Sequence, residues 1–183
     1  MRKKILFLAG MMACSSLAGA QEISKTWVAD KGNGTYQNPV LHADYSDPDI
    51  CAAGDDFYMT ASSFNCIPGI PILHSNDLVN WSLVNYALPV QEPESFFDKA
   101  QHGKGVWAPA IRFHNGEFYI YWGDPDYGIY MIKTKDPKGK WSKPVLVKAG
   151  KGMIDATPLW DEDGKVYLIH AYAGSRSGVN SIL

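Results

Sequence analysis

A unit of strand, turn and strand occurs three times along the chain, and this repeat restricts the possible folds more than any other feature. Each copy begins with a proline and a short apolar segment, continues through a polar turn, and ends in a segment that contains a tyrosine. The copies occupy residues 48–59, 109–120 and 158–168. Repetition of one short unit is typical of repeat architectures, so the sequence predicts several equivalent β units.

Two of the copies continue into a second pair of strands. Residues 70–84 and 128–145 each add a third strand, a turn, and a fourth strand that begins at a Trp-Ser pair. Four antiparallel strands per copy are typical of a propeller blade; the alternative is a β-sandwich in which short motifs match by coincidence. The third copy breaks off at Leu183. Since propellers close with about four to eight blades, we expect an all-β propeller truncated at its C-terminus.

The first twenty residues have the order of a secretory signal peptide. A basic start (Arg2-Lys3-Lys4) precedes an apolar run over residues 5–13 and small residues at 18–20. The alternative is a buried first helix. We expect cleavage after Ala20 and a secreted or periplasmic protein. No other apolar run approaches the length that spans a bilayer, so we expect no membrane association after cleavage.

The mature chain is expected to contain a flexible lead-in and one domain. Residues 21–37 are polar and carry Gly32, Asn33 and Gly34, and the domain is expected over residues 38–183. A hydrophobic content of 46% indicates a globular domain. A net charge of -2 shows no excess of basic residues of the kind that binds nucleic acid. Cys51 and Cys66 could pair in an oxidising compartment or remain buried thiols. The sequence leaves this choice and the oligomeric state open.

Carboxylates and aromatic side chains recur at one end of the copies. If a rotation relates the copies, the residues before the three prolines converge on one axis. Asp47 and Asp155 occupy this end in the first and third copies, and Trp107 occupies it in the second. Paired carboxylates can activate water and protonate a leaving oxygen, as glycosidic bond hydrolysis requires. Trp107 and Phe64 offer flat faces for a sugar ring, although each could equally belong to the core.

These residues resemble glycoside hydrolase family 43. The resemblance covers nearly all of the chain after residue 37. Its matching segments are residues 38–41, 45–50, 57–58, 62–64, 68–70, 73–81, 106–109 and 154–164. It implies a five-bladed propeller, of which this chain supplies about the first two and a half blades. It also implies hydrolysis of β-xylosides, α-L-arabinofuranosides or arabinans with inversion at the anomeric carbon.

The resemblance implies a role for each candidate site residue. Asp47 matches the general base, which is the proton acceptor, and Asp155 matches the aspartate that raises the pKa of the general acid and orients it. Phe64 and Trp107 match positions at the innermost sugar subsite. The proton donor of the family is a glutamate in a Glu-Gly-Pro-like motif one blade further on, and no such motif occurs in this chain.

The remaining expectations concern ligands and the acidic and tryptophan residues that are not assigned to the site. The resemblance implies xylan- or arabinan-derived oligosaccharides as partners and requires no cofactor; a channel calcium, which some members have, is neither supported nor excluded. The alternative function is a non-catalytic propeller that binds glycans or proteins. Asp44 and Asp49 are expected to face solvent or form turns, and Trp81 and Trp141 to pack. The acidic run over residues 161–163 is expected to be a hairpin turn.

Overall fold

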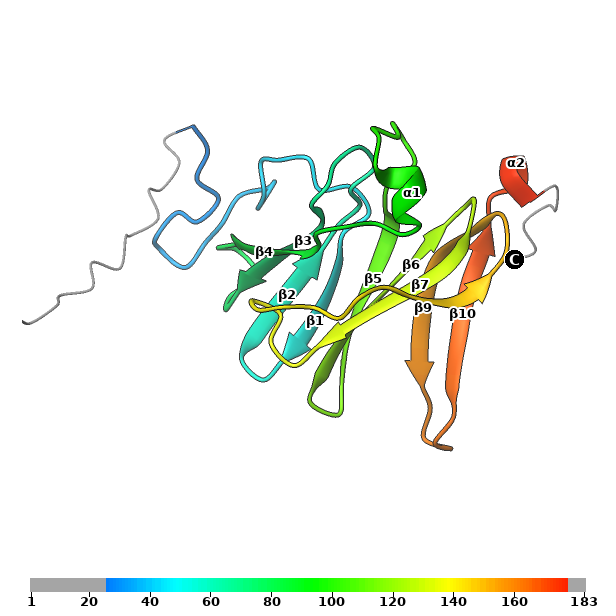
Figure 1. The fold of residues 1–183 in the computed structure, drawn as a ribbon. Coiled ribbons are helices and arrows are strands. Elements are labelled where there is room, and N and C mark those ends of the chain that lie inside the picture. Colours follow the sequence, from blue (N-terminus) through cyan, green and yellow to red (C-terminus); the bar gives the residue numbers. More distant parts are fainter. Residues whose placement is uncertain (1–25, 178–183) are drawn as a thin grey trace, which may run out of the picture.

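The computed structural model describes residues 26–177, which form an all-β fold of three antiparallel sheets (Figure 1). In each sheet every strand pairs with the next strand in sequence. The first blade contains β1 (Asp49–Ala53), β2 (Asp56–Thr60), β3 (Gly69–Ser75) and β4 (Ser82–Leu88). The second blade contains β5 (Trp107–His114), β6 (Glu117–Asp124), β7 (Gly128–Thr134) and β8 (Val145–Ala149). The third hairpin contains β9 (Met153–Trp160) and β10 (Val166–Tyr172), and two short helices, α1 (Glu94–Phe97) and α2 (Gly174–Ser177), complete the fold.

Two predicted segments lie outside the described residues. These are the signal peptide over residues 1–20 and the start of a third strand in the third copy at residues 178–183. Between residues 26 and 177, no helix has the length and apolar character needed to cross a membrane.

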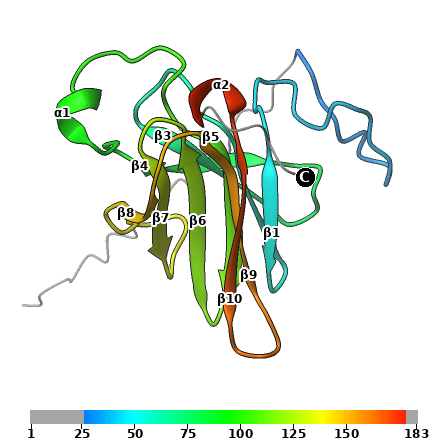
Figure 2. The same cartoon turned by 90° about the vertical axis from the view of Figure 1, so that its right-hand side faces the viewer.

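The predicted strand, turn and strand units are confirmed in all three copies. The hairpins β1–β2, β5–β6 and β9–β10 turn at the same end of the molecule, whereas α1 and α2 lie at the other end (Figures 1 and 2). The β5–β6 turn has φ of 49° at Asn115 and 77° at Gly116. Two positive φ values are what a two-residue type I′ turn requires, and Asn-Gly is its preferred sequence. The acidic run over residues 161–163 also forms a turn, because the Asp161 N–H donates to the Lys165 carbonyl (2.9 Å).

The first strands of the three units lie side by side, with β1 against β5 and β5 against β9. Arg112 on β5 joins all three, because its guanidinium donates to the Asp49 carboxylate and to Thr157 Oγ1 (2.8 Å). The Ile111 N–H also donates to Asp49 (2.7 Å). The expectation that Asp49 faces solvent or forms a turn was therefore wrong, since its carboxylate links two blades. Asp44 is exposed, as expected.

The main core lies between the first and second blades. Its largest fully buried side chains come from β3, β4, β5, β6 and β7, and removing such a side chain from water stabilises the fold by about 1.5–3 kcal/mol. They include Ile70, Ile72, Leu88, Ile111, Ile120, Trp122 and Ile132. A smaller cluster of Ile129, Met153 and Ala156 joins the second blade to β9.

The fourth strands begin later than the sequence predicted. Trp81 and Trp141 precede β4 and β8 and donate their indole N–H groups to turn carbonyls, at Leu78 (3.0 Å) and Pro137 (3.2 Å). In the second blade Pro144 has no N–H for strand pairing, so β8 begins only after it. The packing role expected for Trp141 is confirmed by its burial, and Trp81 is half-buried.

Two smaller expectations concern the N-terminal segment and the cysteines. Asp30 and Tyr36 form a β-bridge, and Asn80 on the first blade donates to Asp30 (2.9 Å), so the lead-in contacts the blade; its flexibility stays a prediction.

Cys51 and Cys66 are both free thiols. Burial raises the pKa of Cys51 to about 12, which keeps it protonated. Cys66 lies exposed in the connection between β2 and β3, so the expectation of a buried thiol was wrong there.

Candidate active site

A β-bulge interrupts the first strand of the second and third units at the end opposite the hairpin turns. In the second blade Ala108 and Pro109 together face one residue of β6, and in the third hairpin Asp155 and Ala156 together face one residue of β10. A bulge of this kind adds one residue to a strand and redirects its side chains.

The first blade has the same irregularity just before β1. The Ser62 N–H donates to the Ser46 carbonyl (2.9 Å), and regular pairing begins at Asp49 opposite Thr60. Two residues, 47 and 48, therefore face residue 61 alone. The same irregularity in three copies identifies positions that are structurally equivalent.

The first residue of each bulge has a left-handed backbone. The φ values are 51° at Asp47, 37° at Ala108 and 54° at Asp155. Few residues other than glycine adopt such values, although aspartate tolerates them better than most. Asp47, Ala108 and Asp155 are therefore equivalent, and the predicted correspondence of the two aspartates agrees with this geometry.

The alignment of the three copies on their prolines was wrong for the third copy. The structural counterpart of Pro48 is Ala156, and Pro158 lies two residues further along β9. In the first two units a proline is the second residue of the bulge, whereas in the third unit Ala156 takes this place. The longer β9–β10 loop (residues 161–165, against two residues between β1 and β2) brings the spacing from Pro158 to Tyr167 close to that from Pro48 to Tyr58, although the two prolines are not equivalent.

Asp47 is exposed and receives two hydrogen bonds on one oxygen. Ser62 Oγ donates to Asp47 Oδ2 (2.7 Å), and Ser46 Oγ donates to the same atom (3.0 Å). Among residues 26–177 no donor reaches the other carboxylate oxygen, Oδ1. The side chain is thus oriented through Oδ2, and Oδ1 is free to accept a proton from a ligand or a water molecule.

Asp155 is electrostatically coupled to Asp47. Partial desolvation raises the pKa of Asp155, and the negative charge of Asp47 raises it further. Like charges interact in this way only when they are near each other. Because β1, β5 and β9 lie side by side, the equivalent bulges also place these two aspartates at the same end of the first and third units.

The two predicted aromatic residues also lie together. The rings of Phe64 and Trp107 meet edge to face with centroids 5.9 Å apart. The Trp107 indole N–H donates to the Gly103 carbonyl (3.0 Å), which fixes the ring. Both side chains are half-buried and so retain exposed surface.

Backbone pairing places these rings beside the bulges. Ser63 and Val106 exchange backbone hydrogen bonds (3.0 and 3.1 Å), and the Gly105 N–H donates to the Phe64 carbonyl (2.9 Å). A Cβ on Gly105 would lie 2.1 Å from the Ser63 carbonyl oxygen, so only glycine permits this approach. The end of the first blade is thereby joined directly to the start of the second.

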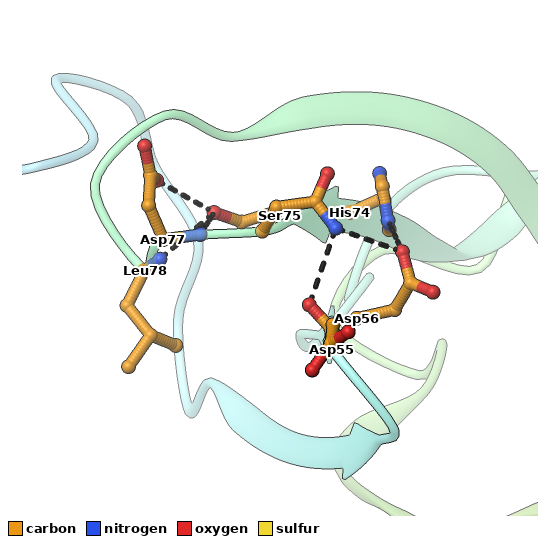
Figure 3. Close-up of polar contacts among 7 residues, drawn as sticks. Asp55, Asp56, His74, Ser75, Asp77 and Leu78 are labelled. Atoms are coloured by element: carbon orange, nitrogen blue, oxygen red, sulfur yellow. Dashed lines mark hydrogen bonds and ion pairs between the residues drawn. The ribbon is translucent and has the colours of Figure 1, made fainter.

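Another group of aspartates lies at the hairpin end of the first blade (Figure 3). Asp56 pairs with the His74 imidazole and accepts from Asn76 Nδ2 (3.0 Å), and these contacts lower its pKa. Asp77 accepts hydrogen bonds from the side chain and the backbone of Asn80, and also from Ser75 Oγ, and these lower its pKa to about 2. This group holds the β3–β4 turn and lies away from the bulges. Among the described residues, no three His, Cys, Asp or Glu side chains are grouped so as to hold a metal ion.

The sequence did not assign three polar residues that shape this region. Arg112 ties the inner strands together, and Ser46 and Ser62 hold Asp47. Ser46 and Ser62 both fall within the segments that carry the family resemblance. That signal marked their positions but gave them no role.

Comparison with known proteins gives consistent matches. The family model described as "Glycosyl hydrolases family 43" matches residues 36–183. A beta-xylosidase of Formosa agariphila is 34% identical over 98% of this chain and 33% of its own length. A non-reducing end alpha-L-arabinofuranosidase of Bacteroides ovatus is 37% identical over 74% of this chain and 26% of its own length.

Solved structures resemble the fold as well. A GH43 protein from Bacillus licheniformis has a TM-score of 0.64 with 36% identity, over 74% of this chain and 28% of that protein. A xylan beta-1,4-xylosidase from Bacillus halodurans has a TM-score of 0.64 with 28% identity, over 79% of this chain and 28% of that protein. This chain therefore spans about a quarter to a third of the length of these relatives.

Proposed function

Because this chain belongs to glycosyl hydrolase family 43, we propose that Asp47 and Asp155 serve the hydrolysis of xylosidic or arabinofuranosidic bonds. The observation that carries this proposal is the placement of two coupled aspartates on equivalent bulges of different blades. Bulges commonly direct side chains at active sites. Relatives named beta-xylosidase and alpha-L-arabinofuranosidase support the substrate class.

We propose Asp47 as the general base of a single-step inversion. Its Oδ1 takes a proton from a water molecule while the water oxygen attacks the anomeric carbon. The glycosidic bond breaks in the same step, and a protonated carboxyl group gives its proton to the leaving oxygen. The exposure of Asp47 supports this role, because a water molecule must reach it.

Asp155 is proposed to keep the general acid protonated and oriented. A negative charge near a carboxyl group disfavours its ionisation and so raises its pKa. Asp155 already takes part in such a like-charge interaction with Asp47. The edge-to-face pair of Phe64 and Trp107 is proposed to form a wall of the innermost sugar subsite, with exposed ring surface beside the bulges.

The general acid is proposed to lie in sequence beyond that of this chain. No Glu-Gly-Pro-like motif occurs in residues 1–183, and the relatives are about three times as long as this chain. The name "extended enzyme" is used below for the protein in which this chain continues to the length of its relatives. The chain of 183 residues alone is expected to show negligible hydrolysis. The proposed chemistry uses carboxyl groups and calls for no cofactor, and the signal peptide expected at residues 1–20 would export the enzyme toward plant polysaccharides.

Proton NMR of the first product tests this function. The extended enzyme is expected to cleave an aryl β-xyloside or an aryl α-L-arabinofuranoside and to release the inverted anomer before mutarotation. Retention of configuration would contradict the single-step mechanism. Binding of pentose oligosaccharides without turnover of any pentoside would instead indicate a non-catalytic glycan-binding propeller.

A further inference from the structure

Ser62 connects the proposed base to the second blade, and we propose that it is the positioning residue that fixes the orientation of Asp47. This inference rests on the proposed function of Asp47. The second blade has Ala108 at the position where the other units have an aspartate. The inference nevertheless gives this blade a part in the reaction.

The hydroxyl group of Ser62 has two partners that together define the direction of its proton. The Ala108 N–H donates to Ser62 Oγ (2.8 Å), and Ser62 Oγ donates to Asp47 Oδ2 (2.7 Å). A hydroxyl group has one proton to donate. Because the Ala108 N–H occupies an acceptor position on the oxygen, the proton is directed at the carboxylate.

The backbone around Ser62 prevents the hydroxyl group from moving away. The Ser62 N–H donates to the Ser46 carbonyl (2.9 Å), and the next residue, Ser63, pairs with Val106 in both directions. Ser62 is therefore held by both blades at once. A donor held in this way can restrict the rotamers of the side chain that it contacts.

Ser46 provides a natural comparison, since it donates to the same oxygen of Asp47 at 3.0 Å. Within the described residues its hydroxyl group makes no second hydrogen bond, so nothing else fixes its rotamer. Two serines thus share one acceptor atom, but only Ser62 is tied to the neighbouring blade.

The consequence for the reaction concerns the second carboxylate oxygen. With Oδ2 held by Ser62, Oδ1 keeps one direction, which is the condition for accepting a proton from a water molecule aligned for attack. The bulge at Ala108 supplies a backbone N–H instead of a carboxylate. The three equivalent bulges therefore contribute a base, the support of that base, and a second carboxylate.

The test compares Ser62→Ala, Ser46→Ala and Ser62→Thr in the extended enzyme with an aryl pentoside. Ser62→Ala is expected to lower kcat about 10- to 100-fold, because a hydrogen bond to a charged group is lost, while KM changes little. The acid limb of the kcat profile is expected to move to higher pH, since the ionised carboxylate has lost a donor. Ser46→Ala is expected to lose only about two- to threefold. Ser62→Thr keeps the hydroxyl group and is expected to restore most of the rate.

Two outcomes would overturn the proposal: an unchanged kcat and pH profile in Ser62→Ala, or an equal loss in Ser46→Ala. If Ser62→Ala does not fold, Ser62→Cys decides, because it retains a side chain of similar size with a weaker donor. Asp47→Ala is measured in parallel. Failure of Asp47→Ala to abolish activity would refute the proposed function itself, whereas loss in Asp47→Ala with an intact Ser62→Ala would refute only the role of Ser62.

Discussion

Aspartates lie at both ends of the first blade, but their surroundings differ. At the hairpin end Asp77 accepts four hydrogen bonds, from Ser75 Oγ, the Val79 N–H and both the backbone and the side chain of Asn80. At the bulge end Asp47 accepts two, both on one oxygen. A carboxylate whose two oxygens are both occupied can fix a turn but has little capacity to take up a proton.

The same turn recurs in the second blade with other residues. Thr134 Oγ1 accepts from the Asp136 N–H (3.1 Å), just as Ser75 Oγ accepts from the Asp77 N–H (3.1 Å). The hairpin end therefore uses aspartate for one structural purpose in both blades. The bulge end keeps the backbone shape and changes the side chain, from Asp47 to Ala108 to Asp155.

The largest effect is expected from removing the carboxylate at the first bulge. Asp47→Ala should lower kcat of the extended enzyme at least about a hundredfold, even for substrates with very good leaving groups, because water still needs a base. Steady-state kinetics with aryl pentosides would measure it. Near-normal activity, with the loss at Asp44 or Asp49 instead, would place the base elsewhere in this stretch.

A different kinetic pattern is expected at the other bulge. Asp155→Asn removes a negative charge near the general acid, so the pKa of that acid falls and the alkaline limb of the pH profile moves to lower pH. The rate should fall about tenfold or more for poor leaving groups and less for good ones. Equal losses for both kinds of substrate would contradict the proposed role of Asp155.

A buried aspartate near the bulge end allows a third test. Burial raises the pKa of Asp124 to about 6, and its Oδ2 and the nearby Gln91 Oε1 both lack hydrogen-bond partners among the described residues. In Asp124→Asn, Oδ1 can still accept from the Asp126 and Tyr127 N–H groups, and the neutral amide carries no charge that burial would penalise. We expect a stability gain of about 2 kcal/mol at pH 7.

The sign of this effect follows from the raised pKa. Folding favours the protonated form of Asp124, so its contribution to stability is present below about pH 4 and is lost as pH rises through about 6. The advantage of Asp124→Asn should therefore appear between pH 4 and pH 6 and disappear below pH 4. Thermal unfolding of the two proteins across this range measures it, and a difference independent of pH would argue against ionisation of Asp124 as the cause.

The smallest effect is expected at the hairpin end. Asp77→Ala removes the side chain that organises the β3–β4 turn, which should lower the free energy of unfolding by about 1 kcal/mol, since the turn is largely solvated. Denaturant unfolding measures the loss, and kcat should stay unchanged. A large loss of kcat with normal stability would show that the two ends of the blade are not separate in function.

The sequence predicted the fold well because apolar periodicity and turn chemistry are local. Asn115-Gly116 fixes its own hairpin, and the repeated Trp-Ser pair marks the second half of two blades. The two aspartates could also be singled out, because they share a position in the repeat. Their coupling across blades agrees with that placement.

The remaining parts of the site depend on contacts between distant segments. Asp49 looked like a turn residue, and only the position of β5 shows that it pairs with Arg112. Ser62 gains its second partner from Ala108, 46 residues away. That Ala156 and not Pro158 is the counterpart of Pro48 likewise becomes visible only through strand pairing.

The bulges also determine which kinds of genetic change the site can survive. A strand alternates its faces residue by residue, so loss of one residue reverses every side chain on one side of the loss. Deletion of Pro48 would leave Asp47 in the gene product and turn its carboxylate toward the other face of the sheet. In an evolving lineage, codon substitutions in these strands can accumulate gradually. A one-codon deletion of Pro48 or of Ala156 would disrupt the site in one event, although both aspartates would remain in the chain.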